Sequence, residues 1–242
     1  MKTKILWMGV ITSLLINLIF ILALYVSEVK GHAYALFLER KGLISLSEDK
    51  HPDHLAFRSW TNTIKKLDIE FDAAFFGNSI THNSNFQIYY PTKKIINLGY
   101  PGDNLMGIKR RIPMLEAANP KKIFIMIGTN DLFYESIDNY SHKYKDLICS
   151  IQSSIPNAKI YLQSILPMNQ DIKKDAPSNE KIIQANNAIK LLSKEFNLPF
   201  IDIYSLYEEN GKLPTSISKD GIHIASESYE KWALFIEPYI ND

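Results

Sequence analysis

Short apolar runs alternate with longer segments of helical period over most of the chain. The apolar runs, which are typical of strands, cover residues 73–76, 95–98, 123–127, 160–162 and 200–203. The segments with apolar residues three or four positions apart, which predict helices, cover residues 105–118, 140–155, 182–196 and 229–240. Strands that alternate with helices indicate right-handed crossovers, so the pattern predicts an α/β fold with a parallel five-stranded sheet between two layers of helices.

The amino-terminal residues follow a different pattern. Residues 5–26 contain no ionisable side chain except the neutral Tyr25, and a helix of that length spans roughly 33 Å, enough to cross a hydrocarbon core about 30 Å thick. A cleaved signal peptide normally has a shorter apolar core, and the uniform apolarity of this segment on all faces argues against a buried core helix. We therefore predict an uncleaved transmembrane anchor within residues 1–30.

The remaining boundaries follow from that anchor. Residues 31–70 are predicted to be a linker and a leading helix, and residues 71–242 the main domain. Lys2 and Lys4 lie directly before the apolar segment, and a short basic tail is readily retained in the cytoplasm. We therefore predict that the main domain lies on the extracytoplasmic side of a membrane, in the periplasm or outside the cell.

Composition excludes several classes of function. The formal net charge is +1, and the sequence has no basic stripe with interleaved aromatic residues, so we expect no nucleic-acid partner. Basic pairs such as Arg110-Arg111 are scattered, and we expect them to lie in solvent. Cys149 is the only cysteine, so an intrachain disulfide is impossible, and its helical context favours packing in the core. No zinc-binding or phosphate-loop motif is present, and we expect no metal and no cofactor.

Polar clusters follow the apolar runs. They are Gly-Asn-Ser-Ile at 77–80, Gly-Tyr-Pro-Gly-Asp at 99–103, Gly-Thr-Asn-Asp at 128–131 and Asp-Gly-Ile-His at 220–223. Because ligands bind outside the carboxyl ends of the strands in an open parallel sheet, we expect all of these clusters at one edge. Turn formation alone explains any single cluster. It does not readily explain a serine, an asparagine and an Asp-x-x-His motif together.

Ser79 and His223 are the candidate nucleophile and base. A serine hydroxyl becomes an effective nucleophile when a base removes its proton, and that base needs an orienting partner. Asp220 lies three residues before His223, close enough in a tight turn to accept an imidazole N–H. Taken alone, Ser79 is equally an ordinary helix N-cap, and the Asp220 motif an ordinary turn.

An ester hydrolysis also needs donors for the developing oxyanion. The candidates are the backbone N–H groups of Ser79 and Gly102 and the side-chain amide of Asn130. Taken alone, Asn130 is equally a turn former. Its neighbour Asp131 is expected to anchor its own loop.

Other residues near these clusters are candidates for substrate binding. Tyr100 and Asn104 flank the glycine loop, so they are expected to line an acyl or leaving-group pocket. His82 lies three residues after Ser79 and is a further pocket candidate, with a surface or capping role as the alternative. Residues 167–178 are rich in Asn, Gln, Asp, Lys and Pro and are a candidate rim over the site.

Together these residues resemble the SGNH (GDSL-type) hydrolase family over about residues 71–239. Ser79, Gly102, Asn130 and His223 match its four name-giving positions in order, and Asp220 matches the acid of its Asp-x-x-His block. The resemblance implies a flavodoxin-like three-layer α/β/α sandwich and an acyl-ester hydrolase that works without a metal. It also implies that the serine is the nucleophile, that the histidine is base and later acid, and that the glycine and asparagine form the oxyanion hole.

One position departs from the family pattern. Asn78 stands where the nucleophile block of the family usually has Asp. An asparagine keeps an acceptor oxygen and adds two N–H donors. We therefore expect activity to be retained.

The sequence thus predicts an anchored serine esterase that acts through an acyl-enzyme. Its expected substrate is a small acyl ester, such as an acetyl ester, on a glycan or lipid of the cell envelope. An acyltransferase that passes the same acyl group to a sugar hydroxyl is one alternative. A non-catalytic envelope protein that binds or scaffolds is another, although all the chemical positions carry competent residue types.

Overall fold

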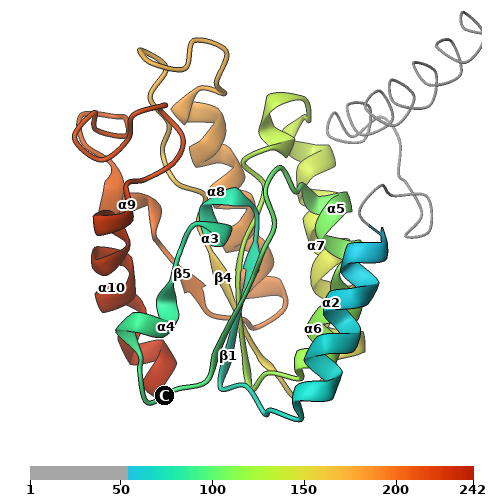
Figure 1. Cartoon of the computed structure of the whole chain (residues 1–242). Helices are drawn as coiled ribbons and strands as arrows, with labels where there is room; N and C mark the ends of the chain where they lie inside the picture. The colour runs from blue at the N-terminus through green and yellow to red at the C-terminus, as the bar shows by residue number, and fades with distance from the viewer. Residues whose placement is uncertain (1–53) are drawn as a thin grey trace, which may run out of the picture.

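The computed structural model describes residues 54–242. In this part the chain forms one five-stranded sheet with helices on both faces (Figure 1). The predicted anchor in residues 1–30 lies outside the described residues, as does the predicted linker up to residue 53. No helix formed by residues 54–242 combines the length and the apolar character that a membrane crossing needs.

The strands confirm the predicted parallel sheet. They are β1 (Ala73–Gly77), β2 (Ile95–Gly99), β3 (Lys122–Met126), β4 (Lys159–Gln163) and β5 (Phe200–Ile201). Their order is β2-β1-β3-β4-β5, and every pairing is parallel. This is the strand order of flavodoxin-like doubly wound sheets.

Helices cover each face and enclose a separate core. One layer consists of α2 (His54–Leu67), α5 (Leu105–Arg110), α6 (Ile112–Ala118), α7 (Ile137–Ser154) and α8 (Asn179–Glu195). The other layer consists of α3 (Ser79–His82), α4 (Phe86–Tyr89), α9 (Tyr204–Tyr207) and α10 (Tyr229–Asn241). Successive residues of β1 enter alternate cores, Phe75 on one face and Phe76 on the other, because side chains alternate across a strand.

The helix predicted over residues 105–118 is interrupted. α5 ends at Arg110 and α6 begins at Ile112, with Arg111 between them in a non-helical conformation. Pro113 lies in the first turn of α6, and a proline has no N–H to continue the hydrogen-bond ladder of the preceding helix. The break separates the predicted helix into two short ones at Arg111.

Two expectations about exposure are wrong. Arg111 was expected in solvent, but its side chain is only 1% exposed. Cys149 was expected in the core, but it is exposed. The buried face of α7 contains Leu147, Ile148 and Ile151, and Cys149 lies on the opposite side of that helix.

The strand register places the ends of β1, β2 and β3 at one level. Gly77 pairs with Gly99 of β2 and with Met126 of β3. A Cβ atom at Gly77 would lie 2.4 Å from the carbonyl oxygen of Met126 and 2.2 Å from Oγ1 of Thr81. Only a glycine fits where the chain turns from β1 into α3.

A buried hydrogen bond joins the sheet to α10 and gives a test of the packing. The indole Nε1 of Trp232 donates to Oε1 of Gln163 at 2.8 Å, and both residues are about 1% exposed. We predict that Gln163→Leu lowers the free energy of unfolding by about 1–3 kcal/mol, because the indole donor loses its acceptor. Urea denaturation measures this loss. The double variant Gln163→Leu/Trp232→Phe should lose less than the sum of the single changes, and strictly additive losses would contradict the coupling.

Candidate active site

All of the predicted polar clusters lie at the carboxyl edge of the sheet. Ser79 opens α3 directly after β1, Gly102 follows β2, and Asn130 follows β3. His223 lies in the irregular segment between α9 and α10. From β1 the chain continues to β2 on one side, and β3 lies on the other side, so this is the topological switch point where open parallel sheets bind ligands.

The three predicted triad residues are hydrogen-bonded to one another. Oγ of Ser79 lies 2.8 Å from Nε2 of His223, across a sequence separation of 144 residues. Nδ1 of the same imidazole lies 2.6 Å from Oδ2 of Asp220. The arrangement is the geometry that a base-activated hydroxyl requires.

The Asp220 carboxylate fixes the tautomer of His223. Its Oδ1 also accepts the backbone N–H groups of Ile222 at 2.9 Å and His223 at 2.8 Å. Burial opposes ionisation of Asp220, but these hydrogen bonds and the one from the imidazole outweigh it and lower its pKa to about 2. The carboxylate therefore only accepts at neutral pH, so Nδ1 of the neutral imidazole holds the proton and Nε2 faces Ser79 as an acceptor.

Asn78 holds the turn that presents Ser79. It is the N-cap of α3, and its Oδ1 accepts the backbone N–H of Ile80 at 3.0 Å. Its side chain is fully buried, and its Nδ2 has no hydrogen-bond partner among the described residues. The acceptor function that an aspartate would supply is therefore kept, and the additional N–H donors are unused.

Gly102 lies in a tight turn after β2. The backbone N–H of Asp103 donates to the carbonyl of Tyr100 at 3.2 Å and closes a turn around Pro101 and Gly102. Gly102 has a φ of 78°, which a type II turn requires at its third position and which glycine adopts without steric cost. The Pro-Gly pair is the sequence signal of this turn.

Asn130 and Asp131 tie the loop after β3 to the loop after β2. Nδ2 of Asn130 donates to the carbonyl of Asp103 at 2.7 Å, and its amide has a second N–H. The buried carboxylate of Asp131 accepts the backbone N–H of Leu105 at 3.0 and 3.2 Å. The expectation that Asp131 anchors its loop is confirmed.

The residues predicted to bind substrate do not all line the same groove. Tyr100 and His82 both line an apolar groove of about 530 Å³ between α2 and the edge strand β2, together with Trp60. Asn104 does not line this groove: it is 3% exposed, and its Oδ1 caps α5 by accepting the N–H of Gly107 at 2.8 Å. The assignment of Asn104 to substrate binding stays a prediction, and the interaction seen for its side-chain oxygen is the cap of α5.

The predicted rim packs beside the histidine turn. The backbone N–H of Asn169 donates to the carbonyl of Gly221 at 2.9 Å. A Cβ atom at Gly221 would lie 3.2 Å from Cβ of Lys173. Residues 167–178 thus support the turn that holds Asp220 and His223.

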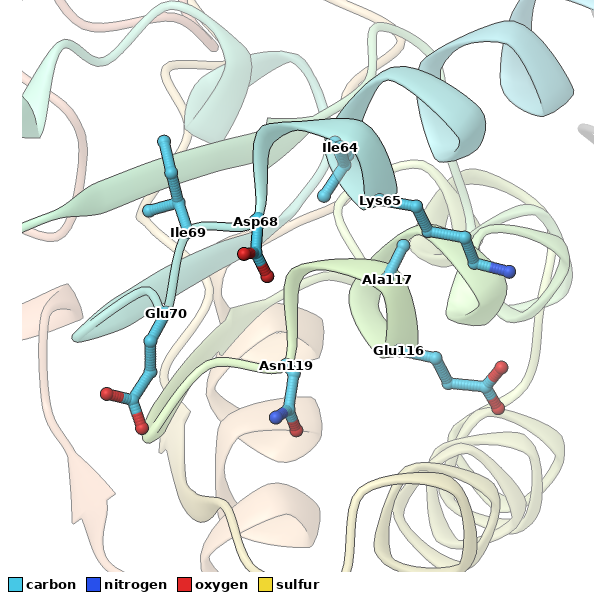
Figure 2. Close-up of a pocket in the computed structure, with 8 residues that line it drawn as sticks. All are labelled: Ile64, Lys65, Asp68, Ile69, Glu70, Glu116, Ala117 and Asn119. Atoms are coloured by element: carbon cyan, nitrogen blue, oxygen red, sulfur yellow. The ribbon is translucent and has the colours of Figure 1, made fainter.

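A second hollow lies at the other end of the molecule. It has a volume of about 440 Å³ and lies between the carboxyl ends of α2 and α6, where Asp68, Glu70 and Glu116 line it (Figure 2). Glu70 precedes β1 and Asn119 precedes β3, so the hollow is at the amino edge of the sheet. It takes no part in the Ser79 site.

One residue at the carboxyl edge, Arg111, is not marked by any signal in the sequence. Arg111 donates to the carbonyl groups of Gly77 and Leu98 and to the carboxylate of Asp103. A pair of adjacent arginines is an ordinary surface feature, so nothing in the local sequence distinguished Arg111. Pro113 marks the helix break beside it, but does not by itself predict burial.

The environment of Asp131 gives a pH-dependent prediction. Burial raises its pKa from 3.8 to about 7, against the opposing effect of the hydrogen bond from Leu105. The folded protein therefore keeps a proton that the unfolded chain loses, so the free energy of unfolding decreases as the pH rises from about 4 to about 7. We predict that Asp131→Asn weakens this decrease, because an amide does not titrate.

Urea denaturation at pH 5 and pH 8 measures that difference. The exposed Asp138→Asn is the matched control for loss of a carboxyl group. An Asp131→Asn protein with the same pH dependence as the wild type would contradict the assignment.

Comparisons with known proteins agree with this geometry. The family model described as GDSL-like Lipase/Acylhydrolase family matches residues 75–231. A GDSL-like lipase from Bacteroides thetaiotaomicron has a similar structure, with a TM-score of 0.63 and 22% identity over 76% of this chain and 97% of that chain. A lipase/acylhydrolase from Enterococcus faecalis matches with a TM-score of 0.60 and 20% identity over 69% of this chain and 94% of that chain.

A variant of an acetyl-xylooligosaccharide esterase from Geobacillus is also similar. Its TM-score is 0.58, with 19% identity over 71% of this chain and 94% of that chain. No curated protein sequence matches the chain. Since the family model covers more than half of the sequence, the protein belongs to the GDSL-like lipase/acylhydrolase (SGNH) family of serine ester hydrolases.

Proposed function

We propose that this protein hydrolyses acyl esters through a covalent acyl-enzyme on Ser79. The observation that carries the proposal is the continuous hydrogen-bonded chain from Ser79 through His223 to Asp220, at 2.8 and 2.6 Å. The order of the groups matches their chemistry: a hydroxyl, a neutral imidazole with its lone pair toward that hydroxyl, and an ionised acid behind it.

The first half-reaction forms the acyl-enzyme. Oγ of Ser79 attacks the ester carbonyl carbon while Nε2 of His223 takes the hydroxyl proton. The carbonyl oxygen becomes an oxyanion, for which the N–H groups of Ser79 and Gly102 and the amide of Asn130 are the proposed donors. The C–O bond to the alcohol then breaks, and the imidazolium returns its proton to the leaving oxygen.

The second half-reaction releases the acid. His223 removes a proton from water, the resulting nucleophile attacks the acyl carbon, and the proton returns to Oγ of Ser79 as the acyl–oxygen bond breaks. Asp220 stays anionic throughout, because its pKa of about 2 is far below the working pH. Its charge stabilises the imidazolium that forms in each half-reaction.

The proposed substrate is a small acyl ester, such as an acetyl ester, on a glycan or lipid of the cell envelope. The catalytic groups are open to a large alcohol portion, since the side chains of His223 and Asp220 are 36% and 54% exposed. The structurally similar Geobacillus protein is an acetyl-xylooligosaccharide esterase, which supports an acetylated saccharide here. The anchor predicted in residues 1–30 would hold the enzyme at the membrane, with its domain on the extracytoplasmic side.

A longer acyl chain is a second candidate, favoured by the apolar groove beside the glycine loop. The groove is lined by Tyr100 and Pro101, which directly precede Gly102, and by His82, which closes α3. Its volume of about 530 Å³ is within the usual range for pockets that bind small molecules. Acetyl esters need none of this space.

Substitution of the triad tests the esterase. With full-length protein in detergent and p-nitrophenyl acetate as substrate, we expect Ser79→Ala and His223→Ala to lower kcat by at least about 10³-fold. Asp220→Asn should lower kcat by about 10²- to 10⁴-fold, because the imidazole loses its orienting anion. Equal rates for wild type and Ser79→Ala would contradict the proposal and would favour a non-catalytic binding protein.

Acyl-chain length separates the two substrate classes. We expect kcat/KM for p-nitrophenyl acetate to exceed that for the octanoate by about 10-fold or more, and Trp60→Ala to leave both values unchanged. Trp60 lines the groove and is 61% exposed. Leu191→Ala, at a similarly exposed residue of α8, is the matched control. A preference for octanoate that Trp60→Ala reduces and Leu191→Ala does not would assign the groove to a long acyl chain.

A further inference from the structure

Arg111 is buried beneath the catalytic edge and bonded to two strand ends. It lies between α5 and α6, with its side chain 1% exposed. Its Nη2 donates to the carbonyl of Gly77, the last residue of β1, at 3.0 Å. Its Nη1 donates to the carbonyl of Leu98, near the end of β2, at 2.5 Å. One planar guanidinium therefore joins two neighbouring strands where they end.

The same guanidinium holds the loop that follows β2. Its Nε donates to Oδ2 of Asp103 at 2.7 Å, and its Nη2 also contacts that oxygen. Asp103 is 5% exposed, so the ion pair is almost completely removed from water. The rings of Phe76 and Tyr100 flank the cation at 5.0 and 5.6 Å. A buried charge of this kind is retained only when its partners satisfy it, as here.

The residues that accept hydrogen bonds from Arg111 lie close in sequence to the proposed oxyanion donors. Gly77 is two residues before Ser79, and Asp103 is the residue after Gly102. The carbonyl of Asp103 in turn accepts the amide of Asn130 at 2.7 Å. The segments that carry all three donors therefore meet at one side chain, either directly or through Asp103.

We propose that Arg111 is a positioning residue for the oxyanion site. The proposal rests on the function proposed for Ser79, Gly102 and Asn130, and it gives Arg111 no contact with the substrate. The guanidinium sets the spacing between these donors before the substrate binds. A lysine keeps the charge but is a single point on a flexible stem, so it cannot hold the same set of acceptors in one plane.

The test compares Arg111→Lys and Asp103→Asn with the wild type in full-length protein. Because preorganised donors act mainly in the transition state, kcat for p-nitrophenyl acetate should fall by about 10- to 100-fold, while KM changes by less than about 3-fold. The affinity for phenylboronic acid, which forms a tetrahedral adduct with an active serine, should fall by a similar factor. Asp103→Asn leaves the arginine in place, so it provides the same test if Arg111→Lys does not fold.

A core variant separates positioning from a general loss of stability. Ile151→Ala removes a fully buried side chain of α7, and it should lower the denaturation midpoint with kcat within about 2-fold of the wild type. A loss of kcat in Ile151→Ala as large as that in Arg111→Lys would overturn the inference. So would an Arg111→Lys protein with the wild-type kcat and boronic acid affinity.

Amide hydrogen exchange of residues 99–105 tests the inference independently of catalytic activity. We expect this loop to exchange faster in Arg111→Lys than in the wild type, and Ile151→Ala to leave it unchanged. Unchanged exchange in Arg111→Lys overturns the positioning function even when the wild type is an active esterase. An inactive wild type in which the loop depends on Arg111 contradicts the proposed esterase and leaves the structural part of this inference supported.

Discussion

The register of the three neighbouring strands β1, β2 and β3 is the constraint on which the site depends. Gly77 is paired with Gly99 on one side and Met126 on the other, so the three chains leave the sheet at one level. Side chains alternate along a strand, and a slip of one residue would exchange the two cores. The same slip would move Ser79 along the sheet relative to the loops that carry Gly102 and Asn130. The packing of β1 between two apolar layers therefore also sets the geometry of the chemistry.

Two aspartates at this edge show how environment divides their functions. Burial dominates at Asp131 and raises its pKa to about 7. Burial also raises the pKa of Asp220, but hydrogen bonds from the His223 imidazole and from two backbone amides together outweigh it and lower the pKa to about 2. Asp220 is thus a permanent anion at neutral pH, as the imidazolium partner must be, whereas Asp131 serves to connect loops. The difference comes from the surroundings, because the two side chains are chemically identical.

Local signals explain what the sequence could predict. Apolar runs followed by turn residues marked each strand and its carboxyl end, and parallel topology then placed Ser79 and His223 at one edge. Arg111 gave no such signal, because its burial depends on the carbonyl groups of two strands and on Asp103, all brought to it by the tertiary fold. Asn104 differs from Arg111 in this respect: its place directly before the first turn of α5 is an N-cap signal that can be read from the sequence.

The asparagine at position 78 is consistent with the charge balance of this edge. The Arg111 cation is already neutralised by Asp103, with which it shares a buried contact. A carboxylate at position 78, where the side chain is fully buried, would be removed from water, and burying a charge costs more than leaving one neutral donor unpaired. Asn78 keeps the bond to the N–H of Ile80 and leaves Nδ2 unsatisfied. The departure from the family pattern thus preserves the turn under Ser79 and places no charge at this fully buried position.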